Sequence, residues 1–230
     1  MKTEYPLITC ICITSNRIAK LQKAISYFKL QDYPNKELII SYPIKDKLTR
    51  YIIDRIISAG ELRIIKLERD DKLSLGEARN QAVAKSNGEY ICTWDDDDWY
   101  HVSRLSYQYH NLKESGGKFK ASILNQLILY DATTQRAYLS FLYPWENTLL
   151  CKREVFTEYQ YSNMDRGEDS NIIDMLDATR QLLHIGGAPF LYVYVYHDGN
   201  TWGYSHFKSF LKRSRLLDDE LANSVAQMIE

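Results

Sequence analysis

The sequence predicts an α/β protein built on a mostly parallel sheet. Over the first hundred residues, short apolar runs typical of buried strands alternate with segments whose apolar residues recur at helical spacing. Turns rich in glycine, proline and asparagine separate these segments. Such an alternation favours parallel strands joined by right-handed crossovers. Because the 230 residues contain no repeat or linker, we expect a single domain over residues 1–230.

Each element of the first half has its own signal in the sequence. Strands are expected where apolar runs meet turn residues, at 7–14, 37–41, 62–67 and 89–94. Helices are expected where apolar side chains share one face, at 17–30, 46–59 and 76–86. Ser15 or Asn16 is expected to cap the first helix, and Gly60 to end the second. Residues 1–100 are therefore interpreted as a nucleotide-binding half.

The pattern changes after residue 100. The expected elements are a helix at 101–114, β-rich runs at 121–130 and 136–142, a helix within 164–180, strands at 182–185 and 190–196, and a charged helical tail at 205–230. Residues 131–135 look like the turn of a hairpin between the two β-rich runs. We expect residues 101–230 to complete the sheet and to receive a second substrate.

Composition excludes several classes of protein. The net charge of -1 gives no reason to expect affinity for nucleic acid. No apolar run approaches the roughly 20 residues that span a bilayer, and the N-terminal residues make a poor secretion signal. The four cysteines have no C-x-x-C spacing, so they are interpreted as reduced core thiols of a cytoplasmic protein.

Four consecutive aspartates, Asp95 to Asp98, directly follow the fourth expected strand. Like charges this close repel one another unless a cation or solvent compensates. Ligands of open α/β sheets bind beyond the carboxyl ends of strands, where carboxylates can hold a hard divalent cation and, through it, a diphosphate. The sequence therefore indicates a metal site for a nucleotide. The plainer alternative is a solvated acidic turn or helix cap, which would normally need only one or two acids.

Several segments resemble the inverting, nucleotide-sugar-dependent glycosyltransferases of family 2. They are 6–17 with its T-x-N-R-type loop, the turn at 31–35, the A-R-N helix at 75–82, the D-x-D-D segment at 88–99 and the E-D motif at 167–170. The resemblance implies the GT-A fold: a Rossmann-like, mostly parallel central sheet flanked by helices, with a smaller β-containing acceptor half and a helical C-terminus. One departure concerns the segment after the second strand. The family usually has a D-D-G-S-type motif that recognises the base, whereas this chain offers Tyr42 or Asp46.

The resemblance implies roles around a donor nucleotide and its metal. Asp97 would bind Mn²⁺ or Mg²⁺, Asp95 would contact metal or ribose, and His197 would complete the metal shell, with His206 as its competitor. Nucleotide contacts are expected from Thr14, Asn16, Arg17, Tyr42, Arg79, Asp95 and Asp96. The simpler alternatives are helix capping for the residues of the first loop and an ordinary surface charge for Arg79.

On the acceptor side, the resemblance makes Asp169 the general base, with Glu168 beside it. The residue pattern alone favours a plainer interpretation, in which these acids complement a helix N-terminus and stabilise it by about 0.3–1 kcal/mol. Acceptor contacts are expected from Trp145, Glu146 and Glu168, because an aromatic ring can pack against a sugar face. The alternative for Trp145 is a half-buried core residue.

The leading hypothesis is a cytoplasmic, metal-dependent inverting glycosyltransferase of glycan or polysaccharide biosynthesis. Its expected donor is a nucleoside-diphosphate sugar, with a UDP-sugar favoured, and its acceptor a saccharide or lipid-linked saccharide. A nucleotidyltransferase or phosphohydrolase is the first alternative, although the loop 14–17 lacks the glycines of a phosphate cradle. A non-catalytic binding module is the second. Basic residues in the tail leave peripheral membrane attachment open: Lys208, Lys212, Arg213 and Arg215.

Overall fold

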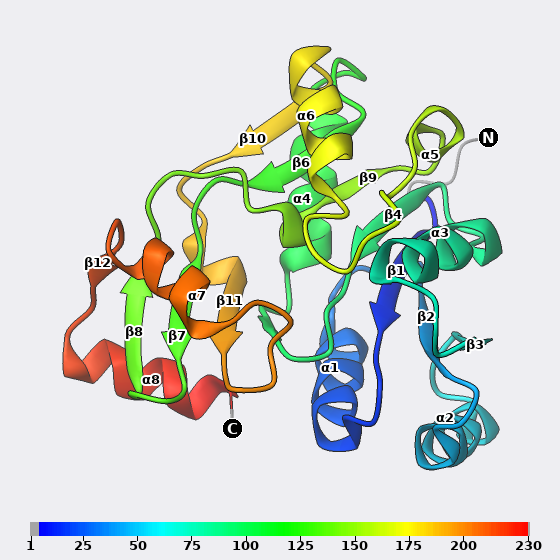
Figure 1. The fold of residues 1–230 in the computed structure, drawn as a ribbon. Coiled ribbons are helices and arrows are strands. Elements are labelled where there is room, and N and C mark those ends of the chain that lie inside the picture. Colours follow the sequence, from blue (N-terminus) through cyan, green and yellow to red (C-terminus); the bar gives the residue numbers. More distant parts are fainter. Residues whose placement is uncertain (1–4, 230) are drawn as a thin grey trace.

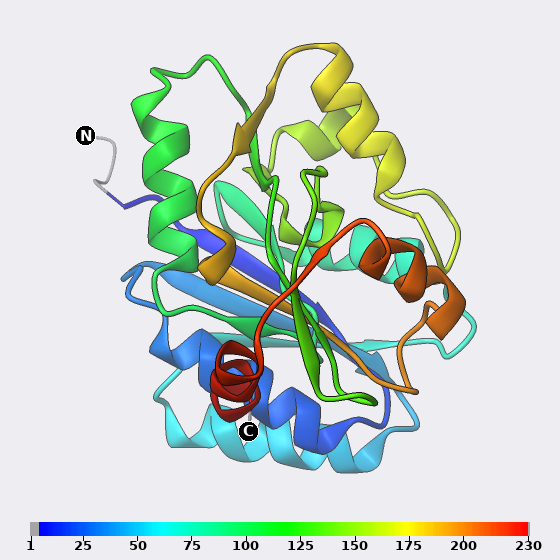
Figure 2. The ribbon, with the colours of Figure 1, turned by 90° about the vertical axis from the view of Figure 1, so that its left-hand side faces the viewer.

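The computed structural model describes residues 5–229, and within them the strands form two sheets (Figure 1). The larger sheet has the strand order β10-β6-β9-β4-β1-β2-β3, and the smaller has the order β12-β8-β7-β11-β5. The smaller sheet lies beside the larger one in Figure 1 and in front of it in Figure 2. This arrangement leaves loops of both sheets facing one another.

The first half follows the expected alternation closely. Its elements are β1 (Ile8–Ile13), α1 (Ile18–Leu30), β2 (Lys36–Pro43), α2 (Lys47–Ala59), β3 (Ile64–Arg69), α3 (Leu75–Lys85) and β4 (Tyr90–Thr93). All of these strands are parallel, with Ile8 of β1 opposite both Lys36 and Tyr90. The prediction of parallel strands with helical crossovers is confirmed. Strands β1, β2 and β4 are buried along almost their whole length, which explains their continuous apolar runs.

The second half contributes strands to both sheets. Its elements are β5 (Trp99–Tyr100), α4 (Arg104–Glu114), β6 (Ala121–Leu124), β7 (Ile128–Asp131), β8 (Arg136–Leu139), η1 (Glu146–Thr148), β9 (Leu150–Lys152), α5 (Val155–Glu158), α6 (Ser170–Ala178), β10 (Leu182–Ile185), η2 (Pro189–Leu191), β11 (Tyr192–Tyr196), α7 (Tyr204–Leu211), β12 (Arg215–Leu216) and α8 (Asp219–Ile229). Strands β7 and β8 form the expected hairpin. Strand β9 runs antiparallel between β4 and β6.

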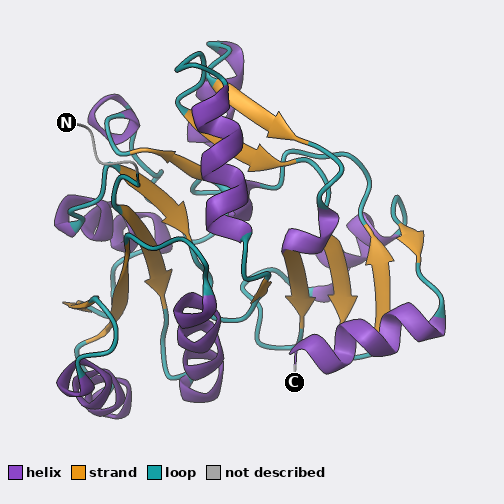
Figure 3. Ribbon diagram, turned by 180° about the vertical axis from the view of Figure 1, so that it is seen from behind, coloured by secondary structure: helices purple, strands orange, loops and turns teal. Residues whose placement is uncertain are grey.

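The helices divide between the faces of the larger sheet. One core joins β1 and β2 to α1, α2 and α4, and a second joins the opposite face to α3, α5 and α6. A third, smaller core lies between the smaller sheet and α8, which Figure 3 shows lying along that sheet. The four cysteines are buried thiols, and burial raises the pKa of Cys12 and of Cys151. No helix among residues 5–229 combines the length and apolarity needed to cross a membrane.

Two expected elements of the second half are divided in the structure. The run 121–130 is not one strand: β6 joins the larger sheet and β7 the smaller, with a connection at 125–127. The tail is not one helix, because β12 separates α7 from α8 and pairs Arg215 with Leu139 of β8. In the first case the apolar pattern continues across a change of sheet, and in the second a two-residue strand interrupts the helical segment. Local periodicity detects neither change.

Helix boundaries also differ from the expectation. The helix expected within 164–180 is α6, which begins at Ser170 directly after Asp169, because Gly167 adopts a φ of 66° that a helix cannot continue. Neither Ser15 nor Asn16 caps α1; Arg17 stands at that position without a side-chain hydrogen bond. Asn16 has a φ of 53°, and its amide N–H donates to Asp46 Oδ2 at 2.8 Å. Asp46, expected as the first residue of the second helix, lies just before α2 and serves as its N-cap.

Candidate active site

A cavity of about 320 Å³ opens beyond the ends of β1 and β4. Two groups of side chains line it. Acids and arginines come from both halves of the chain: Arg17, Arg79, Asp95 to Asp98, Glu146, Glu168 and Asp169. Aromatic side chains come from the second half: Tyr143, Trp145, Tyr194, Trp202, His206 and Phe210. The cavity is therefore polar near the larger sheet and aromatic near α7.

The first two aspartates of the cluster each have a cationic neighbour. Asp95 Oδ1 lies 3.2 Å from Arg79 Nη2. Burial raises the pKa of Asp95 to about 7, against the opposing charge of Arg79. Asp96 Oδ2 accepts a hydrogen bond of 2.6 Å from Thr14 Oγ1, while its Oδ1 lies 3.3 Å from Arg17 Nη1. Burial and the neighbouring Asp97 raise the pKa of Asp96.

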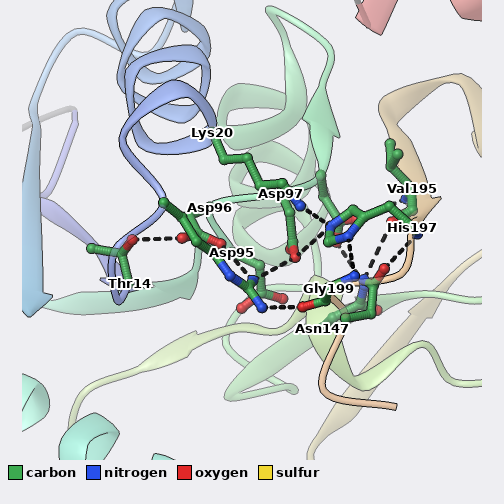
Figure 4. A network of polar contacts seen from close by, with 12 residues as sticks. Thr14, Lys20, Asp95, Asp96, Asp97, Asn147, Val195, His197 and Gly199 are labelled. Atoms are coloured by element: carbon green, nitrogen blue, oxygen red, sulfur yellow. Dashed lines mark hydrogen bonds and ion pairs between the residues drawn. The ribbon is translucent and has the colours of Figure 1, made fainter. Parts of the chain in front are cut away.

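The pKa of Asp97 is shifted in the opposite direction. Its Oδ2 lies 2.8 Å from Arg17 Nη1 and 3.1 Å from His197 Nε2. Burial opposes ionisation, but the His197 hydrogen bond and the charges of Arg17, His197 and Lys20 lower the pKa of Asp97. Lys20 also contacts His197, so these side chains converge from α1, the aspartate loop and the loop after β11 (Figure 4). Asp97 is therefore the member of the cluster held most firmly as a carboxylate.

Asp98 is turned into the protein and ties the cluster to the smaller sheet. It accepts hydrogen bonds from the Tyr192 hydroxyl, from Val195 N at 2.9 Å and from Asn147 Nδ2 at 3.4 Å. Burial and the charges of Asp97 and Asp95 raise its pKa well above the usual range. Asp98 positions the aspartate loop against β11 and η1.

Asp97 and His197 fit a divalent cation. Among the described residues no closed set of three acidic, histidine or cysteine ligands is present. Mg²⁺ and related ions, however, usually take one or two protein ligands and leave the other positions to water and substrate phosphates. Adjacent ligands of an octahedral ion with bonds of about 2.1 Å lie about 3 Å apart, and Asp97 Oδ2 and His197 Nε2 are 3.1 Å apart. Asp95, expected as a further ligand, is paired with Arg79, as Asp97 is paired with Arg17.

Arg79 lies between the aspartate cluster and the E-D motif. It is buried at the inner face of α3, with Nη2 on Asp95 and Nη1 at 3.0 Å from Glu168 Oε1 and 3.4 Å from Asp169 Oδ2. Burial would lower its pKa, but the charges of Glu168, Asp95 and Asp169 raise it. The arginine therefore remains a cation that compensates three acids, of which Glu168 and Asp169 are buried and Asp95 is half-buried.

The E-D motif lines the cavity as expected. Asp169 stands at the N-cap of α6 without a side-chain capping hydrogen bond, and Glu168 precedes it. Both are largely buried, at 8% and 3% exposure. Asp169 makes no capping hydrogen bond, and its carboxylate lies beside Arg79.

Of the residues expected to contact the acceptor, Glu146 lies in the cavity and Trp145 is mostly covered. Burial, followed by the charge of Asp169, raises the pKa of Glu146 to about 7. Trp145 is only 4% exposed, and Tyr143 and Phe210 pack edge-on against its ring. The more exposed aromatic is Trp202, at 37%, which stacks on His206. Nothing in the sequence alone distinguished Trp202 from Trp145.

The expected nucleotide contacts separate into two groups. Arg17 and Asp96 line the cavity, and Thr14 lies directly behind Asp96. Tyr42 is fully buried, its hydroxyl lies 3.2 Å from Glu68 Oε1, and it is not part of the cavity lining. Asp46 is occupied as the cap of α2. Lys20 and Asn147 were missed by sequence reasoning, because their positions on α1 and η1 carry no local signal.

A sequence profile described as "Glycosyl transferase family 2" matches residues 9–136. The chain belongs to this family. The match includes β1 to β4, the aspartate cluster and Arg79. It confirms the predicted family and, with it, the glycosyltransferase class.

Individual comparisons agree with the family. WcaA of Escherichia coli (strain K12), whose name describes a glycosyl transferase of colanic acid biosynthesis, is 34% identical over 103 residues. The match covers 44% of this chain and 36% of WcaA, so the chain spans well under two thirds of that relative.

Two solved structures share the fold. TarS 1–349 of S. aureus, in complex with UDP-GlcNAc, aligns with a TM-score of 0.68 at 12% identity over 84% of this chain and 59% of TarS. The mannosyltransferase PcManGT of Pyrobaculum calidifontis, in complex with GDP-Man and Mn²⁺, aligns with a TM-score of 0.67 at 16% identity. The alignment covers 92% of this chain and 63% of PcManGT. At such identities the likeness shows the fold, and it confirms the predicted GT-A architecture.

Proposed function

We propose that the protein is a metal-dependent, inverting glycosyltransferase that moves a sugar from a nucleoside diphosphate to an acceptor hydroxyl. The observation that carries this proposal is that Asp97, whose carboxylate pairs with His197, lines the same cavity as the Asp169 carboxylate. Such a transfer needs charge stabilisation at the departing diphosphate, a base at the acceptor and a fixed geometry between them. Asp97, at one end of the polar lining, would serve the charge stabilisation, and Asp169, at the other end, would serve as the base.

Asp97 and His197 would hold Mn²⁺ or Mg²⁺ at the donor end. When bound, the cation neutralises the negative charge that develops on the diphosphate. Arg17 contributes a second positive charge, since its guanidinium already reaches Asp96 and Asp97 beside the expected metal position. Bidentate contact with phosphate oxygens suits a guanidinium of this kind.

Asp169 would take the proton from the acceptor hydroxyl. In a single displacement the acceptor oxygen bonds to the anomeric carbon, while the bond to the diphosphate breaks and leaves its electron pair on the diphosphate. Arg79 orients Asp169 and Glu168 and limits the repulsion between them. A UDP-sugar remains the favoured donor; the related folds bind UDP-GlcNAc and GDP-Man.

The acceptor is proposed to be a saccharide or a lipid-linked saccharide in polysaccharide biosynthesis, a role supported by the name of WcaA. The aromatic side of the cavity suits such a ligand, because aromatic rings pack well against sugar faces. A cytoplasmic or membrane-peripheral location and a single-domain organisation stay predictions.

The test is a transfer and hydrolysis assay with Mn²⁺ and a panel of UDP-, GDP- and dTDP-sugars. We expect nucleoside diphosphate release, a product of inverted anomeric configuration, and a loss of at least about 100-fold in turnover for Asp97→Ala and Asp169→Asn. Pyrophosphate release would identify a nucleotidyltransferase instead. Wild-type protein that binds nucleotide but turns over no donor would identify a binding module.

A further inference from the structure

A row of aromatic rings on the acceptor side of the cavity has an arginine at each end. The rings of this aromatic row belong, in spatial order, to Trp202, His206, Phe210 and Phe141, and successive centroids are 4.0, 4.8 and 6.2 Å apart. The Arg166 guanidinium lies 5.4 Å from the centroid of Trp202, and the Arg213 guanidinium lies 3.7 Å from that of Phe141. Both arginines are exposed. The aromatic row therefore carries a solvent-accessible cation at either end.

Segments that are far apart in the sequence build the aromatic row. Trp202 comes from the loop after β11, and Arg166 comes from the loop before α6 that also carries the E-D motif. His206 and Phe210 are one turn apart, so they lie on one face of α7. Trp202, His206 and Phe210 all line the cavity. The aromatic row is therefore part of the cavity wall.

The two guanidinium groups have no acidic partner within the described range 5–229. The ion pairs of the site use Arg17 and Arg79 instead. Asp165, which precedes Arg166 in the sequence, accepts a hydrogen bond of 3.0 Å from Leu75 N. A contact between a cation and an aromatic ring does not require the N–H donors of the guanidinium. Those donors are available to bind a carboxylate or a phosphate in bidentate fashion.

The polar end of the cavity disfavours a negative charge on the acceptor. The acids of its lining are Asp95 to Asp98, Glu146, Glu168 and Asp169. The two arginines of that end, Arg17 and Arg79, are already paired with some of these acids. Because like charges repel one another, an anionic group of a bound acceptor is favoured beside the aromatic row and disfavoured beside the expected base.

We propose that the aromatic row binds an acidic oligosaccharide as the acceptor. Sugar rings pack against the aromatic side chains, while Arg166 and Arg213 bind the anionic groups of the same molecule. This inference rests on the proposed function, because it takes the aromatic side of the cavity as the acceptor side. The anionic group is a carboxylate of the sugar itself or a phosphate that links the saccharide to a lipid or to another sugar, and a guanidinium binds both in the same way. The row is several rings long, which suits an oligosaccharide better than a single sugar.

The experiment is a calorimetric titration of the protein, without donor, with three tetrasaccharide probes. Cellotetraose is neutral, the tetramer of cellouronic acid carries a carboxylate on each sugar, and cellotetraosyl phosphate carries a single phosphate. We expect at least one anionic probe to bind about tenfold or more tightly than cellotetraose, and this preference to shrink at about 0.5 M NaCl, because salt screens exposed charges. Preference for the carboxylated probe identifies an acidic sugar, and preference for the phosphorylated probe identifies a phosphate-linked saccharide. Equal affinity for all three probes, or no binding of either anionic probe, overturns the proposal.

Variants locate the preference on the two arginines. Arg166→Gln and Arg213→Gln should each reduce the preference about three- to tenfold, with the affinity for cellotetraose unchanged. Trp202→Ala should weaken all probes by a similar factor, because it removes an aromatic ring and no charge. Arg55→Gln, which removes an exposed arginine of α2 outside the cavity lining, is the matched control and should keep the wild-type preference. A preference that is lost in Arg17→Gln but kept in the Arg166 and Arg213 variants places the anion at the donor end and overturns the proposal.

The titration needs neither donor nor turnover, so it decides this inference independently of the proposed function. A protein that shows the arginine-dependent preference but transfers no sugar from any donor contradicts the proposed function and leaves an acidic-saccharide site. Conversely, transfer with the same kcat/KM to neutral and to anionic acceptors supports the transferase and overturns this inference.

Discussion

Arg79 Nη1 lies 3.4 Å from Asp169 Oδ2, although ninety residues separate the two along the chain. The other terminal nitrogen of the same guanidinium lies 3.2 Å from Asp95 Oδ1. One buried cation on α3 therefore connects the aspartate cluster, at the expected donor end, to the expected base. The arginine sets the spacing between the two ends of the site.

Removal of this cation should cost stability in a pH-dependent way. Arg79→Ala leaves Asp95, Glu168 and Asp169 uncompensated, so we expect the free energy of unfolding to fall by about 3–5 kcal/mol at about pH 8. At about pH 5 the loss should be smaller, because the uncompensated acids then take up protons. Urea unfolding at both pH values measures this. An equal loss at both would show that Arg79 stabilises the fold by packing alone.

The metal site can be tested by distinguishing two histidines. His197 Nε2 lies 3.1 Å from Asp97 Oδ2, whereas His206 stacks on Trp202 at the aromatic side of the cavity. Calorimetric titration of Mn²⁺ in the presence of UDP should therefore show about 10- to 100-fold weaker binding for His197→Ala. His206→Ala, the matched control, should bind Mn²⁺ like wild type. Weakened binding in His206→Ala alone would transfer the metal assignment to that residue.

Ionisation of Glu146 should lower the free energy of unfolding as the pH rises. Its folded pKa of about 7 lies above the ordinary value of 4.5, so the folded state holds a proton that the unfolded state has released between these values. Stability is thus lost as the pH rises from about 4.5 to 7. After allowance for partial exposure and screening, Glu146→Gln should be more stable than wild type by about 1–2 kcal/mol at about pH 8 and unchanged at about pH 4. A variant equally stable to wild type at both would refute the raised pKa.

Gly76 should be intolerant of any side chain. It is the second residue of α3, and a Cβ built there would overlap the backbone carbonyl of Ser162 and lie 3.2 Å from Glu168 Cβ. Gly76→Ala must push away the loop that carries Glu168 and Asp169, so we expect a loss of about 1–3 kcal/mol in the free energy of unfolding and reduced transfer activity. Gly186→Ala is the control, since its Cβ would meet nothing within 4 Å. Thermal denaturation and the transfer assay measure both effects.

Local sequence predicted the parts of the fold that local physics controls. Continuous apolar runs correspond to β1, β2 and β4 because parallel strands covered on both faces require them. Gly60 ends α2 in the left-handed conformation, as expected. The run 121–130 was misread because a strand that passes from one sheet to another keeps the same apolar pattern.

The same distinction between local sequence and tertiary contacts applies to the site. The order of motifs along the chain predicted that the aspartates, Arg79 and the E-D motif belong to one site, and the structure places them along one cavity. The partners of these residues could not be identified in this way. Asp95 pairs with Arg79, and Asp98 turns inward to Tyr192.

By itself, the sequence determined the family, the alternation of strands and helices, and the edge of the sheet at which the chemistry would lie. Tertiary structure alone decided which acid keeps its charge, which aromatic ring is exposed and which histidine faces Asp97. The reason is physical: pKa values, exposure and ligand geometry depend on neighbours brought together across as many as a hundred residues. Periodicity and motifs report only on neighbours along the chain.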